Sequence, residues 1–274
     1  MPKTIMMIHA ACGSYRSWEF YRPWFEERGW EVLTPNLRLH DGEPHGAPPD
    51  GLGTTSIADY VGDLEKEIDR LDEPPVLMGH SLGALIVQML AARGKAKAGI
   101  LLTPAAPAGI VVVTKKMITA LLPIVLKWGW WRRPLSFTRD QCGTLIMYPL
   151  SDAEVDHEYS KLVAESGRAF FEFAFWNFDR RRTTRVDETK VDCPLLVVAG
   201  GADGLVPASA CRKIAKKFGT NATYKEVDGM GHWPIAGAHA KEVADFSAEW
   251  LNEILAPAKL KTTTDAGESA AAAQ

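Results

Sequence analysis

The sequence predicts an α/β fold in which a mostly parallel sheet of about six strands is flanked by helices and carries an inserted, mainly helical cap. Short apolar runs of the strand type alternate with amphipathic segments of helical period over most of the 274 residues. This alternation is typical of parallel strands joined by crossover helices. Between residues 103 and 195 the pattern becomes mostly helical and rich in aromatic residues. We therefore predict a core from residues 1–103 and 191–256, with a cap from residues 104–190.

The first part of the predicted core alternates strands and helices in chain order. We expect strands at residues 4–8, 31–33, 76–78 and 99–103, and helices at residues 17–28, 57–71 and 82–93. The helix from residue 57 has the clearest pattern, because its apolar residues recur at helical spacing behind a candidate capping box of Ser56 and Asp59. The third and fourth strands are apolar throughout, which is typical of central strands that are covered on both faces.

The α/β order resumes after the predicted cap. We expect strands at residues 195–199 and 223–227, a helix at residues 207–218, and a last helix on which Val243, Phe246, Trp250 and Ile254 share one face. Residues 257–274 are polar and rich in alanine, with nothing to anchor them to a core. We expect this tail to be disordered.

Charge and cysteine usage limit the classes of partner and site. The 31 basic and 34 acidic residues are mixed along the chain, and the formal net charge is −3, so we expect no nucleic-acid partner. The four cysteines lie far apart, without a CxxC pair or a histidine at zinc-site spacing. This pattern predicts neither a disulfide framework nor a metal site, and it favours the reducing cytoplasm.

Two apolar segments are candidates for a signal peptide or a transmembrane helix. The run at residues 5–8 is too short for the apolar region of a signal peptide with a cleavage site after it. The segment at residues 110–131 is interrupted by Lys115, Lys116 and Lys127 and contains Pro123, whereas a membrane span needs about 20 mostly apolar residues. We expect neither a secretory leader nor a transmembrane segment.

The motif with the clearest chemistry is Gly79-His80-Ser81-Leu82-Gly83, which matches G-x-S-x-G between a predicted strand and a predicted helix. This is the context that a nucleophile elbow requires. A serine on so tight a turn needs glycine neighbours, and it gains the N-terminal end of the helix beside its oxygen. We interpret Ser81 as the nucleophile.

A serine nucleophile needs a base, and the base needs an acid that orients it. Of the seven histidines, His232 lies in a glycine-rich loop after a late strand and before the final helix, where it can reach the carboxyl edge of the sheet. The other six are interpreted as structural or surface residues: His9, His40, His45, His80, His157 and His239. Asp203 follows the strand at residues 195–199 and leaves the same edge as Ser81, although a turn or N-cap aspartate is the competing interpretation.

The order Ser81, Asp203, His232 is the one expected of α/β hydrolases. The sequence resembles the α/β-hydrolase family over residues 3–255, including the elbow, the D-x-x-V-P segment at Asp203 and the G-x-G-H-x-P segment at His232. Its compact form, which begins at what looks like the third strand of the family, is similar to plant methylesterases and hydroxynitrile lyases. The resemblance implies an oxyanion hole from the N–H groups of Leu82 and Ala11, with Cys12 as the alternative to Ala11, because His9-Ala10 replaces the usual His-Gly pair.

The cap suggests an apolar substrate. Its apolar residues would form a roof over Ser81 if they face inward, or they would form the cap's own core: Val111 to Val113, Met117, Leu121, Leu122 and Trp128 to Trp131. A basic cluster at Arg180 to Arg182 with Arg185 is interpreted as a solvated loop.

The leading interpretation is hydrolysis of an apolar, small-molecule carboxylic ester through an acyl-enzyme on Ser81, without a metal or organic cofactor. Serine at the elbow argues against the dehalogenase and epoxide hydrolase relatives, which need a carboxylate there. The same triad can serve lactone opening, perhydrolysis or carbon–carbon cleavage. A ligand-binding protein without catalysis is the third interpretation, against which the intact triad argues.

Overall fold

The computed structural model describes residues 3–256, and a six-stranded parallel sheet lies at its centre. The strand order is β2-β1-β3-β4-β7-β8. The strands are β1 (Lys3–Ile8), β2 (Trp30–Leu33), β3 (Val76–His80), β4 (Ala98–Leu102), β7 (Leu195–Gly200) and β8 (Ala222–Val227). The predicted α/β class with about six mostly parallel strands is confirmed, and the predicted tail lies outside the described residues.

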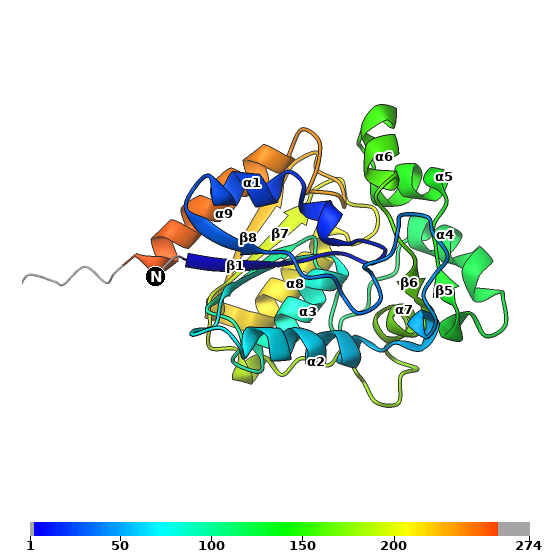
Figure 1. Ribbon diagram of the computed structural model, residues 1–274, viewed down its shortest axis with the longest axis horizontal. Coiled ribbons are helices and arrows are strands. Elements are labelled where there is room, and N and C mark those ends of the chain that lie inside the picture. The colour runs from blue at the N-terminus through cyan, green and yellow to red at the C-terminus, as the bar shows by residue number, and fades with distance from the viewer. Residues whose placement is uncertain (1–2, 257–274) are drawn as a thin grey trace, which may run out of the picture.

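Helices cover both faces of this sheet (Figure 1). One face packs against α2 (Ile57–Ile68), α3 (Leu82–Ala91) and α8 (Ala208–Phe218). The other face packs against α1 (Tyr21–Glu26) and α9 (Ala240–Leu255). Because β3 and β4 are covered on both faces, every one of their residues is buried, as their apolar sequences predict.

Of two local predictions, the capping box before α2 is confirmed and the single helix at residues 17–28 is wrong. The capping box of α2 is present, since the Ser56 side chain accepts from the backbone of the first turn and Asp59 accepts from the Ser56 N–H. The single helix expected at residues 17–28 is wrong: a 3-10 turn (Tyr15–Trp18), capped by Ser14, precedes a separate α1. Pro23 has no N–H to donate to the carbonyl four residues earlier, so a continuous helix through this segment would lack that bond.

We refer to residues 104–190, which lie between β4 and β7, as the cap segment. It contains α4 (Lys115–Val125), β5 (Pro134–Leu135), α5 (Arg139–Gln141), α6 (Asp152–Tyr159), β6 (Glu165–Ser166) and α7 (Gly167–Ala174). Figure 1 shows these elements gathered beyond the end of the sheet at which β1 ends. Leu121, Trp130, Leu135 and Phe170 form a separate small core within the cap segment.

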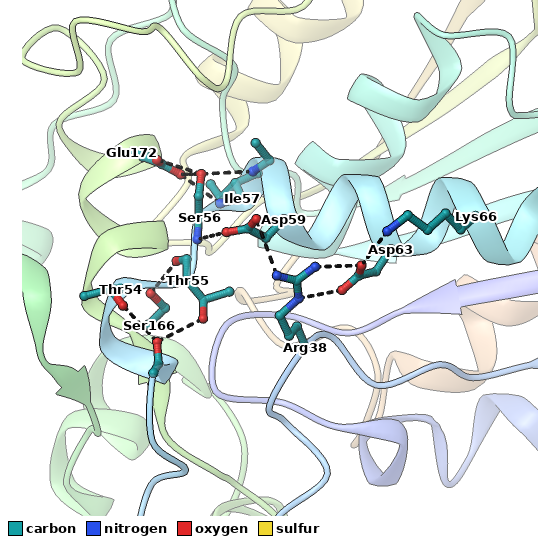
Figure 2. Close-up of polar contacts among 12 residues, drawn as sticks. Arg38, Thr54, Thr55, Ser56, Ile57, Asp59, Asp63, Lys66, Ser166 and Glu172 are labelled. Carbon is teal, nitrogen blue, oxygen red and sulfur yellow. Dashed lines mark hydrogen bonds and ion pairs between the residues drawn. The ribbon is translucent and has the colours of Figure 1, made fainter.

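Polar contacts join the cap segment to the first turn of α2 (Figure 2). The buried carboxylate of Glu172 accepts from the Ser56 hydroxyl at 2.8 Å and from the Ile57 N–H at 2.8 Å. The Ser166 hydroxyl donates to the carbonyl oxygen of Thr55 at 2.6 Å. An acidic side chain at a helix N-terminus satisfies N–H groups that have no partner within the helix. α7 is thereby held against the core.

No helix in the range 3–256 combines the length and the apolar character that crossing a membrane requires.

Candidate active site

Ser81 lies on the turn between β3 and α3, in a backbone conformation that non-glycine residues rarely adopt. Its φ is 51° and its ψ is −111°. A Cβ at Gly79 would overlap the backbone of Gly83, and a Cβ at Gly83 would overlap the carbonyl oxygen of Ile8. Only glycine at both positions lets the turn close against β1. This is the geometry that the elbow motif predicts.

The three residues predicted as a triad lie in one hydrogen-bonded row. His232 Nε2 is 3.0 Å from Ser81 Oγ, and His232 Nδ1 is 2.7 Å from Asp203 Oδ2. Asp203 Oδ1 accepts from the N–H groups of Leu205 and Val206, each at 2.8 Å. Asp203 therefore uses one oxygen to shape its own loop and the other to orient the imidazole. Both His232 and Asp203 are buried.

The main chain of His232 is held by two donors. His80 Nε2 lies 2.8 Å from the carbonyl oxygen of His232, and Thr103 Oγ1 donates to the same oxygen at 3.1 Å. Burial, together with the adjacent His232, lowers the pKa of His80 to about 3, so His80 is neutral and carries its proton on Nε2. The sequence predicts a structural role for His80. It gives no signal for Thr103, which was expected only as the last residue of an apolar strand.

The loop after β1 forms a turn, and its residues Ala10 and Ala11 line the same cavity as Ser81. The Gly13 N–H donates to the Ala10 carbonyl at 3.0 Å, and Cys12 has a φ of 61°. The Cys12 N–H donates to Glu165 Oε2 at 3.2 Å and is therefore occupied. Within residues 3–256 the N–H groups of Ala11 and Leu82 have no hydrogen-bond partner. Of the two residues considered for the second oxyanion donor, Ala11 has a free N–H and Cys12 does not.

A cavity of about 490 Å³ opens above Ser81 and His232. Its lining from the cap segment is almost entirely apolar and includes Val111, Val112, Val113, Met117, Leu121, Leu122, Phe170 and Phe173. The predicted tryptophans at residues 128–131 do not line the cavity: Trp130 packs in the core of the cap segment and Trp128 is 86% exposed. Of the predicted set, the aliphatic residues and Met117 line the cavity, together with phenylalanines of the cap segment such as Phe170 and Phe173.

Residues 5–246 match the family model described as Alpha/beta hydrolase family. The chain belongs to this family. A Mycoplasma pneumoniae protein provisionally named esterase/lipase 2 is 25% identical over 270 residues, which cover 91% of this chain and 89% of that protein. The predicted family resemblance is confirmed.

Solved structures of other proteins share the fold of this α/β hydrolase. A methylesterase from Arabidopsis is 12% identical with a TM-score of 0.69, and the match covers 92% of this chain and 99% of that one. A monoacylglycerol lipase from Paleococcus ferrophilus is 21% identical with a TM-score of 0.68, covering 91% and 94%. A pyrethroid hydrolase from Sphingobium faniae is 18% identical with a TM-score of 0.66, covering 94% and 99%.

Sequence reasoning missed one buried polar cluster of this α/β hydrolase. His40, which the sequence left as a structural or surface residue, is fully buried, and its Nε2 lies 3.3 Å from the carboxylate of Glu165, which is also fully buried. The two residues are 125 positions apart and neither belongs to a recognisable motif. No signal in the sequence could have paired them.

Among residues 3–256, no group of three or more histidine, cysteine, aspartate or glutamate side chains is arranged to hold a metal ion.

Proposed function

We propose that this α/β hydrolase cleaves carboxylic esters through an acyl-enzyme on Ser81. The observation that carries the proposal is the row from Ser81 through His232 to Asp203, with contacts of 3.0 and 2.7 Å, at the floor of an apolar cavity. This arrangement supplies a nucleophile, a base and an orienting acid in the order that acyl transfer needs. The name of the Mycoplasma pneumoniae relative, esterase/lipase 2, is consistent with it.

In the first half of the proposed reaction, Ser81 Oγ attacks the ester carbonyl carbon while His232 Nε2 takes the hydroxyl proton. Asp203 stabilises the imidazolium through the contact with Nδ1, and its other oxygen is held by two backbone N–H groups. The free N–H groups of Ala11 and Leu82 donate to the carbonyl oxygen and stabilise the negative charge that develops on it. The N-terminal end of α3 adds a favourable field at the same place.

In the second half, the tetrahedral intermediate collapses and His232 returns the proton to the departing alcohol. A water molecule then attacks the acyl-serine carbonyl carbon while His232 takes one of its protons. The bond from the acyl carbon to Ser81 Oγ breaks, His232 gives the proton to Ser81 Oγ, and the carboxylic acid leaves. Every proton is transferred through His232 Nε2. The neutral imidazole must therefore carry its own proton on Nδ1. The contact from His232 Nδ1 to Asp203 selects that tautomer.

We propose a small, apolar ester as the substrate. The cavity is lined mostly by aliphatic and aromatic side chains, and the polar side chains of Ser81, His232 and Asn177 also belong to its lining. Its volume of about 490 Å³ lies within the range of about 300–1,000 Å³ that small-molecule sites occupy. An acyl chain or an aromatic group fits such a surface better than a charged group does.

We also propose a reducing compartment, the cytoplasm, for this chain. Cys12, Cys142, Cys193 and Cys211 are all free and buried. Unpaired cysteines are typical of proteins in reducing compartments.

The test is hydrolysis of p-nitrophenyl esters of increasing acyl length by the purified full chain, with Ser81→Ala in parallel. We expect turnover by the wild type, loss of turnover in Ser81→Ala, and stoichiometric labelling of the wild type alone by a fluorophosphonate. Labelling without turnover of any ester would overturn the ester proposal and direct attention to lactones and carbon–carbon bonds. Absence of labelling in a folded wild type would overturn the nucleophile itself.

A further inference from the structure

Four hydrogen-bond donors converge on one buried carboxylate that the proposed reaction does not use. Glu165 lies in β6, in the cap segment, and is fully buried. Its Oε2 faces the Cys12 N–H at 3.2 Å and His40 Nε2 at 3.3 Å. Its Oε1 accepts from the Tyr60 hydroxyl at 2.8 Å and from the Ser166 N–H at 2.6 Å. A carboxylate can accept all four bonds, whereas an amide has one acceptor oxygen for them.

The geometry sets the charge state of this cluster. His40 Nδ1 lies 3.0 Å from the Arg38 carbonyl oxygen, so both ring nitrogens of His40 face acceptors, and an imidazolium satisfies both. Burial opposes charge on each partner, but the charge of Glu165 and its hydrogen bond raise the pKa of His40, and those of His40 lower the pKa of Glu165. Glu165 and His40 therefore form a buried ion pair.

The other titratable groups that face the pair are neutral. Burial, with the neighbouring His40, lowers the pKa of His9 to about 3; its Nδ1 faces the Ala10 carbonyl at 2.8 Å and its Nε2 accepts from the Leu37 N–H at 3.0 Å. Burial, with the charge of Glu165, raises the pKa of the Tyr60 hydroxyl and of the Cys12 thiol well above their ordinary values. The ion pair is thus the only charge in the cluster as the structure describes it.

The cluster is attached directly to the loop that carries the proposed oxyanion donor. Cys12 is held by the cap segment on both sides of its backbone: its N–H donates to Glu165, and its carbonyl oxygen accepts from the Val163 N–H at 2.9 Å. Cys12 has a positive φ of 61°, which a non-glycine residue keeps only when its surroundings hold it there. Ala11, whose N–H is free, directly precedes Cys12 in the same turn.

We propose that Glu165 is a positioning residue for the oxyanion hole: it acts through the Cys12 N–H to fix the turn that aims the Ala11 N–H at the reacting carbonyl oxygen. This proposal rests on the function proposed above. A hydrogen-bond donor stabilises the developing charge only if it is already in place, because misalignment must otherwise be corrected at the transition state. The cap segment would in this way complete the catalytic machinery of the core as well as roof its cavity.

The decisive comparison is Glu165→Gln with Glu172→Gln. Both glutamates are fully buried, lie in the cap segment and join it to the core, but Glu172 contacts the first turn of α2 (Figure 2) and not the loop after β1. In Glu165→Gln one carboxylate oxygen becomes an NH₂ group, which cannot accept a hydrogen bond. Depending on which oxygen is replaced, the Cys12 N–H or the Tyr60 hydroxyl loses its acceptor. Glu172→Gln controls for the loss of a buried carboxylate that bridges the cap segment and the core.

We expect Glu165→Gln to lower kcat about 10- to 100-fold with KM near the wild-type value, since removal of a whole oxyanion donor costs about 10²–10³ in kcat. The rate of Ser81 labelling by a fluorophosphonate, whose phosphoryl oxygen occupies the oxyanion site, should fall in parallel. Hydrogen exchange at the peptide that contains Cys12 should accelerate. Glu172→Gln should leave all three quantities near wild type, whatever it does to the melting temperature.

Tyr60→Phe extends the test to a milder change, because it removes one donor to Glu165 and leaves the loop untouched. We expect kcat to fall, but by less than in Glu165→Gln. This variant also keeps the proposal testable if Glu165→Gln does not fold. Equal labelling rates in Glu165→Gln and Glu172→Gln, or in Tyr60→Phe and wild type, would overturn the positioning role while the proposed function stands. If wild-type Ser81 does not label at all, the proposed function fails instead, and the two failures are distinct.

Discussion

The imidazole of His80 donates from Nε2 to the backbone carbonyl oxygen of His232, 2.8 Å away, so the residue before the proposed nucleophile holds the proposed base in place. The ring of His80 also packs edge-on against Trp233, with 5.0 Å between the centroids. The elbow therefore positions both Ser81 and the loop that carries its partner. Thr103, which follows β4, donates to the same carbonyl oxygen through its hydroxyl.

Thr103→Val should test how much the second donor contributes. The substitution keeps the branched shape of the side chain and removes the hydroxyl that donates to the His232 carbonyl oxygen. We expect a loss of about 1 kcal/mol in the free energy of unfolding and a several-fold fall in kcat, because His80 remains as a donor. Urea unfolding and steady-state kinetics measure both effects. Thr103→Ser, which keeps the hydroxyl, should stay close to wild type; an equal loss in both variants would argue against the bond.

Asp203→Asn should abolish most of the proposed activity without unfolding the chain. The asparagine oxygen can still accept from the N–H groups of Leu205 and Val206, but its NH₂ then faces His232 Nδ1 and favours the wrong imidazole tautomer. We expect kcat to fall on the order of 10³- to 10⁴-fold, as in other triads. Ester turnover and a thermal melt on the same preparation provide the measurement. Retention of more than a tenth of wild-type kcat would contradict the role of Asp203.

Gly83→Ala and Gly62→Ala should have opposite effects on stability. A Cβ at Gly83 would overlap the backbone carbonyl oxygens of Ile8 and His9, which cannot move aside as a flexible side chain could. A Cβ at Gly62, in α2, meets nothing within 4 Å. We expect Gly83→Ala to lower the melting temperature strongly, while Gly62→Ala raises the free energy of unfolding by about 1 kcal/mol through helix propensity. Differential scanning calorimetry measures the melting temperature of both variants. A Gly83→Ala variant as stable as wild type would mean that the elbow is less tightly packed against β1.

Ala106→Phe should shorten the acyl chain that the cavity accepts. Ala106 lines the cavity, so a phenyl ring there fills part of its volume. We expect the preferred length in a p-nitrophenyl ester series to move to shorter chains, with kcat/KM for short chains largely kept. Leu126→Ser is the matched control, because Leu126 is exposed and does not line the cavity. Should both variants retain the wild-type length preference, the acyl group binds elsewhere.

The ion pair of His40 and Glu165 should make stability depend on pH. The raised pKa of His40 contributes stability that is fully present below 6.5 and is lost as the pH rises through the folded value. The lowered pKa of Glu165 contributes stability that is present above 4.5 and is lost as the pH falls through its folded value. The pair therefore stabilises the fold most between about pH 4.5 and 6.5.

We expect the excess in unfolding free energy of wild type over His40→Gln to be larger at pH 5.5 than at pH 9. Urea unfolding of the two proteins at both values measures the excess. A difference that does not change with pH would show that His40 is neutral in the folded state.

Much of the fold follows from local pattern. Each strand of the central sheet was predicted to within two residues at either end. For β3, β4 and β7, which are buried throughout, the reason is that a buried parallel strand needs a short apolar run. The elbow followed from glycine on both sides of Ser81, since only that residue fits the turn. The predicted helix at residues 17–28 was wrong because helical periodicity does not register the bond that Pro23 removes.

The sequence by itself determined the α/β class, the elbow and the three residues that the structure then brings into one row. Only the tertiary structure decided that Cys12 donates to Glu165, that His40 is buried and charged beside it, and that Trp128 faces outward while Val112 lines the cavity. The periodicity of apolar residues shows which face of a helix or strand is buried, so it describes only residues that are close in sequence. A contact between Cys12 and Glu165, 153 positions apart, depends on how the cap segment docks on the core, which no local pattern encodes.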